Sequence, residues 1–147
     1  IKEIRRSVNE LRPDALERFS LEYAVTKMVT DMSTVSDASI YFNCEVKNMK
    51  FDEDEENDIY RVIQEGITNA IRHGKAKKIW VTMSEKDSNI LLQIRDNGIS
   101  SKEIKSGFGT KHMKERIGML GGTVSFDGSH GCLVNATIPI RWGEEYD

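Results

Sequence analysis

The feature that most constrains the fold is an apolar stripe with the period of an α-helix in the middle of the chain. Small or apolar residues recur between Asp52 and Gly74 at the spacing of one helical face, namely Ile59, Val62, Ile63, Gly66, Ile67, Ala70 and Ile71. Two segments of strand character follow, 79–84 and 90–95, joined by a polar turn. The pattern predicts a helix that ends near Gly74 and packs on an antiparallel hairpin.

Further periodic segments extend this pattern in both directions. We expect a helix over 21–34 and a strand through 40–46 before the stripe, and a helix over 110–120 after it. Gly121-Gly122 predicts the end of that last helix, and the final strands are expected at about 123–127 and 133–140. The 147 residues therefore predict one α/β (α+β) two-layer sandwich, with about three helices covering one face of a mixed, largely antiparallel sheet.

The start of the chain predicts the end of an amphipathic helix. Ile1, Ile4, Val8 and Leu11 are spaced by three or four residues, and Pro13 disfavours a helical conformation at the residue before it. Because the chain begins at Ile1 within this pattern, we expect a piece of a longer protein whose upstream part could carry membrane segments.

Composition excludes several classes of function. A net charge of −3 with dispersed Lys and Arg argues against nucleic-acid binding. Cys44 and Cys132 are too isolated for a zinc motif and predict a reduced, cytoplasmic protein. No apolar run approaches the roughly 20 residues of a membrane span, so no direct membrane contact is expected.

The central helix also carries polar residues suited to a metal and phosphates. Glu65 and Asn69 lie one turn apart on the same face, at the edge of the apolar stripe. An Asn oxygen suits Mg²⁺, whose shell phosphates and waters can complete. Arg72 and His73 could reach phosphate oxygens. The alternative, from this helix alone, is a set of solvated charges and an ordinary histidine near the helix end.

Two glycine-containing segments follow the hairpin. Asp96-Asn97-Gly98 would place a carboxylate at a strand end, where it could accept a hydrogen bond from an exocyclic amine such as that of adenine. Gly107-Phe108-Gly109 precedes a helix and offers amides to an anion, with a polar, lid-like stretch before it. Each signal alone also fits an ordinary turn or loop.

Together these motifs resemble the GHKL (Bergerat-fold) ATPases, in particular the ATP-binding domain of two-component sensor histidine kinases. The segment 60–73 is similar to the N box of the nitrate-sensor, DesK and VraS-like group. Asp96-Asn97-Gly98 is similar to its first glycine box, and 107–109 with 113–116 and 120–122 to its second. The segment 11–16 resembles the junction that follows the group's dimerisation helices. Residues 1–18 would then be the helix end and junction, and 19–147 the ATP-binding domain.

The resemblance implies ATP and Mg²⁺ as cofactors and a role for each matching residue. Asn69 would bind Mg²⁺, and Glu65 would be the catalytic acidic residue beside the metal and triphosphate. Asp96 would bind the adenine amine. The remaining residues of the implied ATP site are Arg72, His73, Gly98, Gly107, Phe108, Gly109, Thr110 and Lys111.

The implied function is transfer of the ATP γ-phosphate to a histidine on an upstream helix, for relay to an Asp of a LuxR-type response regulator. The full-length protein would be a homodimer. None of the three histidines, His73, His112 and His130, matches the phosphoacceptor. Two alternatives stay open, an anti-sigma-factor-type serine kinase and a non-catalytic nucleotide-sensing module. Ser100 and Cys132 depart from the family pattern, in which a glycine and a threonine are usual.

Overall fold

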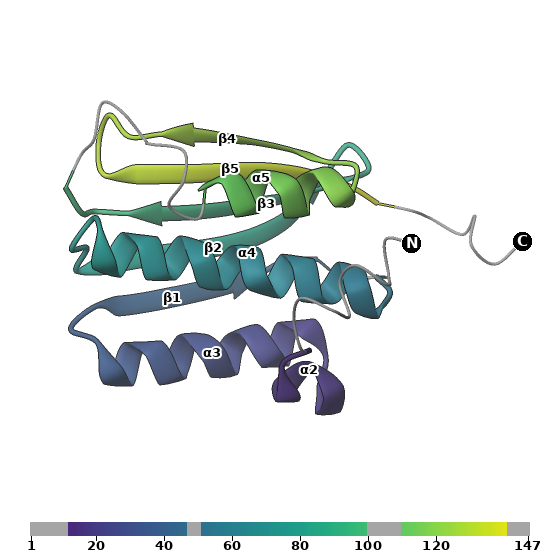
Figure 1. The fold of residues 1–147 in the computed structure, drawn as a ribbon, viewed down its shortest axis with the longest axis horizontal. Coiled ribbons are helices and arrows are strands. Elements are labelled where there is room, and N and C mark those ends of the chain that lie inside the picture. The colour runs from purple at the N-terminus through teal and green to yellow at the C-terminus, as the bar shows by residue number, and fades with distance from the viewer. Residues whose placement is uncertain (1–11, 47–50, 100–109, 141–147) are drawn as a thin grey trace, which may run out of the picture.

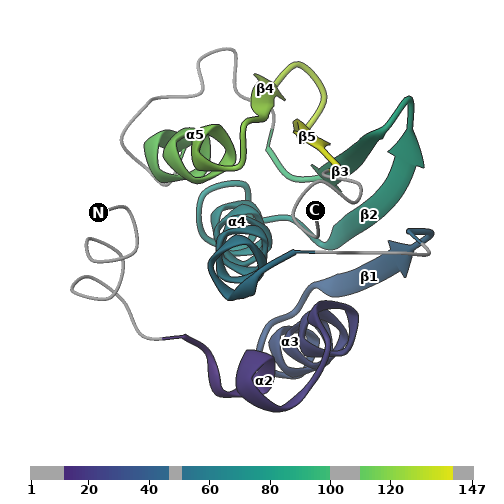
Figure 2. The same ribbon diagram turned by 90° about the vertical axis from the view of Figure 1, so that its right-hand side faces the viewer.

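A computed structural model describes residues 12–46, 51–99 and 110–140 as a five-stranded sheet with helices on one face (Figures 1 and 2). The strand order is β1-β2-β3-β5-β4. The elements are α2 Asp14–Arg18, α3 Leu21–Val35, β1 Ser39–Cys44, α4 Glu53–Arg72, β2 Lys78–Lys86, β3 Asn89–Asp96, α5 Thr110–Met119, β4 Thr123–Asp127 and β5 Cys132–Pro139. The predicted two-layer sandwich is confirmed.

The pairing of the strands follows from how each is connected. β2 and β3 pair antiparallel, with Ile79 opposite Asp96, as their short connection predicts. β3 with β5 and β4 with β5 are also antiparallel. β1 and β2 are parallel, because α4 crosses the sheet between them and returns the chain to the same edge. The sheet is therefore mixed and largely antiparallel.

Helix α4 is the centre of the helical layer, and its apolar stripe faces the sheet. The stripe is buried from Ile59 to Ala70, whereas Ile71 is half-buried. Gly66 allows a close approach, since an added Cβ would lie 2.6 Å from Cδ1 of Ile94 on β3. The buried side chains that complete the core under this helix are Ile79, Val81, Met83, Ile90, Leu92 and Ile94. Burial of a stripe this long anchors α4 to the sheet.

The two ends of α4 have different chemistry. At its start the Asp52 carboxylate accepts the Glu55 amide at 2.8 Å, and the Glu55 carboxylate accepts the Asp52 amide at 3.0 Å. This capping box explains the acidic cluster as helix-terminal chemistry. At its end the Asn69 carbonyl accepts the amides of His73 and Gly74. The acidic start is therefore closed by local hydrogen bonds.

Two details differ from the sequence-based expectation. A five-residue helix, α2, forms directly after Pro13, within the predicted junction. The first strand ends at Cys44, two residues before the expected end at Val46, which is nevertheless buried. Among the described residues, no helix is long and apolar enough to cross a membrane.

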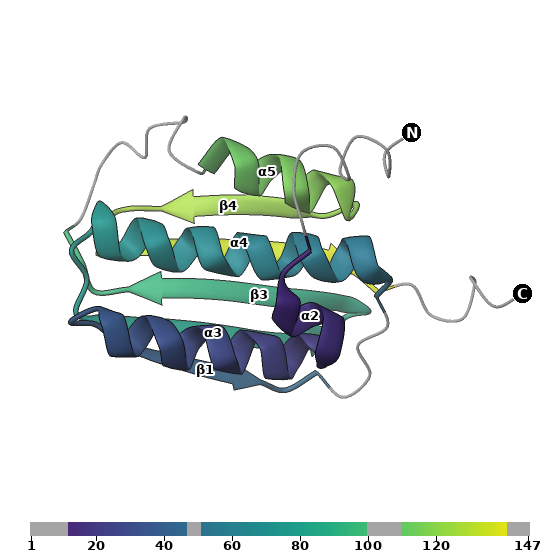
Figure 3. The ribbon, with the colours of Figure 1, turned by 60° about the horizontal axis from the view of Figure 1, so that its bottom comes forward.

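One end of the molecule collects the segments that the motifs singled out (Figures 1 and 3). The C-terminal end of α4, the end of β3, the start of β5 and the N-terminal end of α5 all lie at this end, which we call the site edge. It is on the left in Figure 1. The parallel and antiparallel directions of these elements bring residues from distant parts of the chain together there.

Candidate nucleotide-binding site

The site edge is built around the carboxylate of Asp96, the last residue of β3. Its side chain is buried, with 6% of the residue exposed. The amide of Gly98 donates to Oδ1 at 2.8 Å, and the amide of Cys132 donates to the same carboxylate. Burial raises the pKa of Asp96 and the two amide bonds partly offset that rise. No cation pairs with this carboxylate in the described part of the chain.

Two close backbone contacts hold the segments of the site edge together. The Ile99 amide donates to the Gly74 carbonyl at 2.7 Å, and a Cβ on Gly98 would lie 2.3 Å from that same oxygen. On the other side, a Cβ on Gly131 would lie 2.2 Å from the Asp96 carbonyl. Only glycine fits at both positions. The end of α4, the Asp96 loop and the β4–β5 hairpin therefore meet at one point.

The polar face of α4 leads towards this point. Glu65 and Asn69 are half-buried at the edge of the apolar stripe, as their spacing predicts, while Arg72 and His73 are exposed. Neither Glu65 nor Arg72 forms an ion pair among residues 12–46, 51–99 and 110–140. A carboxylate, an amide and a guanidinium therefore follow one another along α4 towards the site edge. These groups are of the kind that bind Mg²⁺ and phosphate oxygens.

The start of α5 forms another side of the candidate site. Thr110 is buried and Lys111 is exposed at the first turn of this helix. The predicted site residues Gly107, Phe108 and Gly109, like Ser100, lie outside the described residues, so their roles stay predictions. Of the predicted site, the structure brings together Asp96, Gly98 and the end of the α4 polar face.

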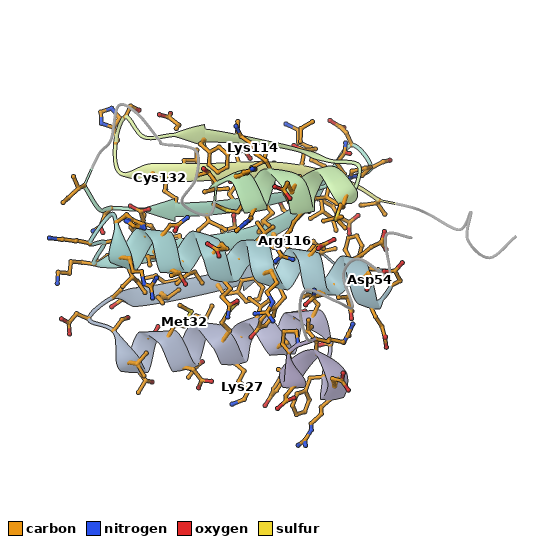
Figure 4. All side chains as sticks on the ribbon, viewed as in Figure 1. Lys27, Met32, Asp54, Lys114, Arg116 and Cys132 are labelled. Carbon is orange, nitrogen blue, oxygen red and sulfur yellow. The ribbon has the colours of Figure 1, made fainter. Side chains whose placement is uncertain are left out.

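Cys132 occupies the start of β5, directly opposite Asp96 in the strand register (Figure 4). Burial and the nearby charges of Asp96 and Asp127 raise the pKa of its thiol to about 11. The thiol is therefore protonated at neutral pH and behaves as a small, weakly polar group. The Asp96 carboxylate, opposite Cys132 on β3, is the buried acceptor at this position.

The far half of α4 carries contacts that the sequence did not reveal. Asp58, 1% exposed, accepts from Nη1 of Arg116 on α5 at 3.4 Å (Figure 4). Arg12 donates to the carbonyls of Glu53 and Leu16 and to the Glu56 carboxylate at 2.9 Å. The contacts of Arg12 with Glu53 and Glu56, and of Asp58 with Arg116, join positions 41 to 58 residues apart, so no local spacing could have identified them.

The arrangement suits nucleotide chemistry. A buried acceptor-only carboxylate without a cation favours a ligand that donates a hydrogen bond, such as the 6-amino group of adenine, and disfavours the carbonyl of guanine at the same place. The described residues hold no group of three or more His, Cys, Asp or Glu side chains placed for a metal. Mg²⁺ takes few protein ligands when phosphates are bound, and the Asn69 oxygen and the Glu65 carboxylate are the groups on α4 that could hold it.

Comparisons with known proteins agree with this reading. The family model of the histidine kinase-, DNA gyrase B-, and HSP90-like ATPase matches residues 54–141. The signal transduction histidine-protein kinase/phosphatase UhpB of Salmonella typhimurium is 28% identical over 142 residues, which cover 95% of this chain and 28% of that protein. The chain thus spans little more than a quarter of that relative.

Solved structures show the same fold. The histidine kinase domain of the blue-light activated histidine kinase from Erythrobacter litoralis EL346 superposes with a TM-score of 0.69 at 17% identity, over 82% of this chain and 65% of that one. The ATP binding domain of PrrB from Mycobacterium tuberculosis gives 0.65 at 17%, over 80% and 91%. The family match covers more than half of the chain, so the predicted resemblance is confirmed. The chain belongs to the histidine kinase-, DNA gyrase B- and HSP90-like ATPase family.

Proposed function

We propose that this chain is the ATP-binding catalytic domain of a sensor histidine kinase, which delivers the γ-phosphate of ATP to a histidine on an upstream helix. The observation that carries the proposal is the buried carboxylate of Asp96, which accepts two backbone amides at the site edge and pairs with no cation among the described residues. The similarity to UhpB over almost the whole chain supports the kinase assignment.

Each residue of the site has its own role in ATP binding. Asp96 accepts a hydrogen bond from the adenine amine, and Gly98 lets the backbone pass close to the base. Asn69 binds Mg²⁺ and Glu65 lies beside the metal and triphosphate. The exposed side chains of Arg72 and His73 contact the phosphates from the end of α4. The remaining residues assigned to ATP binding are Gly107, Phe108, Gly109, Thr110 and Lys111.

Catalysis in this scheme rests on position and charge. Phosphoryl transfer asks the protein mainly to align the γ-phosphate with its acceptor and to neutralise developing charge. A bound Mg²⁺ would supply part of that neutralisation. The apolar stripe of α4 is buried in the same core as β3, and this packing holds Glu65 and Asn69 in place relative to Asp96.

The wider role is a two-component phosphorelay. The acceptor histidine belongs to dimerisation helices of the same protein, the full-length protein is a homodimer, and the phosphoryl group passes to an Asp of a LuxR-type response regulator. Joining this chain to its upstream helices and following ³²P from ATP tests this part. Acid-labile phosphate on a histidine is expected, and phosphoserine on an added partner would instead support the serine-kinase alternative.

Calorimetric titration of this chain with a non-hydrolysable ATP analogue tests the site itself. Binding is expected to require Mg²⁺ and to be lost when the GTP analogue is used. Asn69→Asp is expected to weaken binding about tenfold or more, because a second carboxylate beside the triphosphate repels it. Asn43→Asp, the same exchange on β1, is the matched control and should bind like the parent. Equal affinity for both nucleotides, or no binding, contradicts the proposal.

A further inference from the structure

We propose that Asn97 is a positioning residue of the nucleotide site, one that fixes the base-binding loop against the end of α4 without contacting the ligand. The inference rests on the proposed ATP site. It concerns the residue between the two that the family motif assigns, Asp96 and Gly98.

The side chain of Asn97 bridges two segments that are distant in sequence. Its Oδ1 accepts the backbone amides of Lys77 at 3.0 Å and Lys78 at 2.8 Å, 20 and 19 residues away. Its own amide donates to the Lys78 carbonyl at 3.1 Å. Asn97 thus makes three hydrogen bonds to Lys77 and Lys78, two through its side chain and one through its backbone amide. They join the loop after β3 to the connection between α4 and β2.

That connection leads directly to the contact at which the loop meets α4. Gly74 accepts the Ile99 amide at 2.7 Å, and the space beside its carbonyl admits no Cβ on Gly98. Asn97 lies between Asp96, whose carboxylate accepts the Gly98 amide, and this contact. A shift of the loop at Asn97 would therefore displace the base-binding carboxylate relative to the polar face of α4.

An asparagine that merely shapes a turn would bond within its own segment. Asn89 does so at the opposite end of the same two strands, where its Nδ2 donates to the carbonyl of Asp87, two residues away, at 3.0 Å. Asn97 instead bonds across the hairpin to Lys77 and Lys78. The difference in partners assigns to Asn97 a role in holding two walls of the site together.

The test compares Asn97→Ala with Asn97→Asp and the control Asn89→Ala, by calorimetry with the ATP analogue at a temperature where each variant is folded. Asn97→Ala is expected to lose about tenfold in affinity, because the loop is no longer ordered before binding. Asn97→Asp keeps an oxygen that accepts both amides and is expected to stay within about threefold of the parent. Asn89→Ala should bind like the parent.

Amide hydrogen exchange gives a second readout that does not depend on the ligand. In Asn97→Ala the amides of Lys77 and Lys78 should exchange faster than in the parent, whereas Asn89→Ala should leave them protected. Parent-like affinity or parent-like protection in Asn97→Ala overturns the inference. If Asn97→Ala does not fold, Asn97→Gln replaces it, since its longer side chain misplaces the acceptor, and parent-like binding by that variant overturns the inference equally.

The outcomes separate this inference from the proposed function. A parent protein that does not bind the ATP analogue contradicts the proposed function, while the exchange of Lys77 and Lys78 still tests the bridging contacts of Asn97. A parent that binds, with Asn97→Ala equal to it, contradicts the inference alone.

Discussion

Asp58 on α4 and Asp96 at the end of β3 are both buried carboxylates, 1% and 6% exposed, but their hydrogen-bond partners differ. Asp58 on α4 faces the guanidinium of Arg116 on α5 at 3.4 Å. Asp96 at the end of β3 has two backbone amides and no cation among the described residues, and burial raises its pKa. Asp58 therefore has its charged partner within the fold, whereas Asp96 can accept a hydrogen bond from a bound ligand.

The difference separates stability from binding. A paired buried charge joins the two helices, and its removal takes from Arg116 one of its partners. A buried charge that only accepts amides keeps its remaining lone pairs for a ligand and costs the fold some stability. We therefore expect changes at the Asp58 end to alter unfolding and changes at the Asp96 end to alter nucleotide affinity.

The largest effect on stability is expected from Asp58→Ala. It leaves the Arg116 guanidinium without this carboxylate and should lower the free energy of unfolding by about 3 kcal/mol in urea denaturation. Nucleotide affinity, measured where the variant is folded, should stay near the parent value. The double variant Asp58→Leu, Arg116→Met should recover most of the loss, since it removes both charges. A single variant as stable as the parent would show that the pair of Asp58 and Arg116 does not stabilise the fold.

Asp96→Asn is expected to do the opposite. The proposed charged hydrogen bond from the adenine amine to Asp96 would be worth about 2 kcal/mol, so the affinity for the ATP analogue should fall about thirtyfold in calorimetry. Stability should change by less than about 1 kcal/mol, because relief of the buried charge offsets a weakened amide bond. Asp127→Asn, at the exposed end of β4, is the control and should keep parent affinity. A stable variant with full affinity would show that Asp96 does not read the base.

Asp52→Ala tests a carboxylate that, like Asp96, accepts a backbone amide but lies exposed at the start of α4. Loss of this cap should lower the free energy of unfolding by about 1 kcal/mol. Affinity for the ATP analogue should not change, since the cap is at the far end of the helix from the site edge. Asp52→Ser, which retains an acceptor, should restore most of the stability. A loss of affinity in Asp52→Ala would mean that the carboxylate at the start of α4 also contributes to nucleotide binding.

The smallest effect is a pH dependence carried by Asp96. Its pKa is raised in the folded state above the ordinary value of 3.8, so the unfolded chain releases this proton at lower pH than the folded chain does. The contribution of Asp96 to stability is therefore greatest below the ordinary value and decreases as the pH rises towards the raised value. The difference in unfolding free energy between the parent and Asp96→Asn, measured across this range, should move in favour of the variant. A constant difference would contradict the raised pKa.

Most of the fold could be predicted from periodicity because each element has a strong local signal. The apolar stripe of α4 and the alternation of β2 and β3 mark their own faces, and Gly121, at φ +76°, ends α5 at the expected place. The short α2 was not predicted, because five residues after a proline carry no periodic pattern. The parallel pairing of β1 was not specified either, since it depends on the path of α4 across the sheet.

The site divides in the same way. Short motifs predict Asp96, Gly98, Asn69 and Glu65 as site residues, because the chemistry of each is visible in its residue type and neighbours. Asn97 was visible only as part of a turn dipeptide, since its partners are about 20 residues away. The raised pKa of the Cys132 thiol likewise comes first from burial and then from the charge of Asp96, which lies opposite it on the neighbouring strand.

Local spacing and residue chemistry are enough to predict the class of fold, the order of its elements, the family resemblance and the candidate nucleotide residues. Only the folded structure shows that Asp58 pairs with Arg116, that Asp96 has no cation among the described residues, and that Asn97 bonds to Lys77 and Lys78. Burial and hydrogen bonding depend on what lies beside a residue in space, and here those neighbours come from segments 19 to 58 residues away.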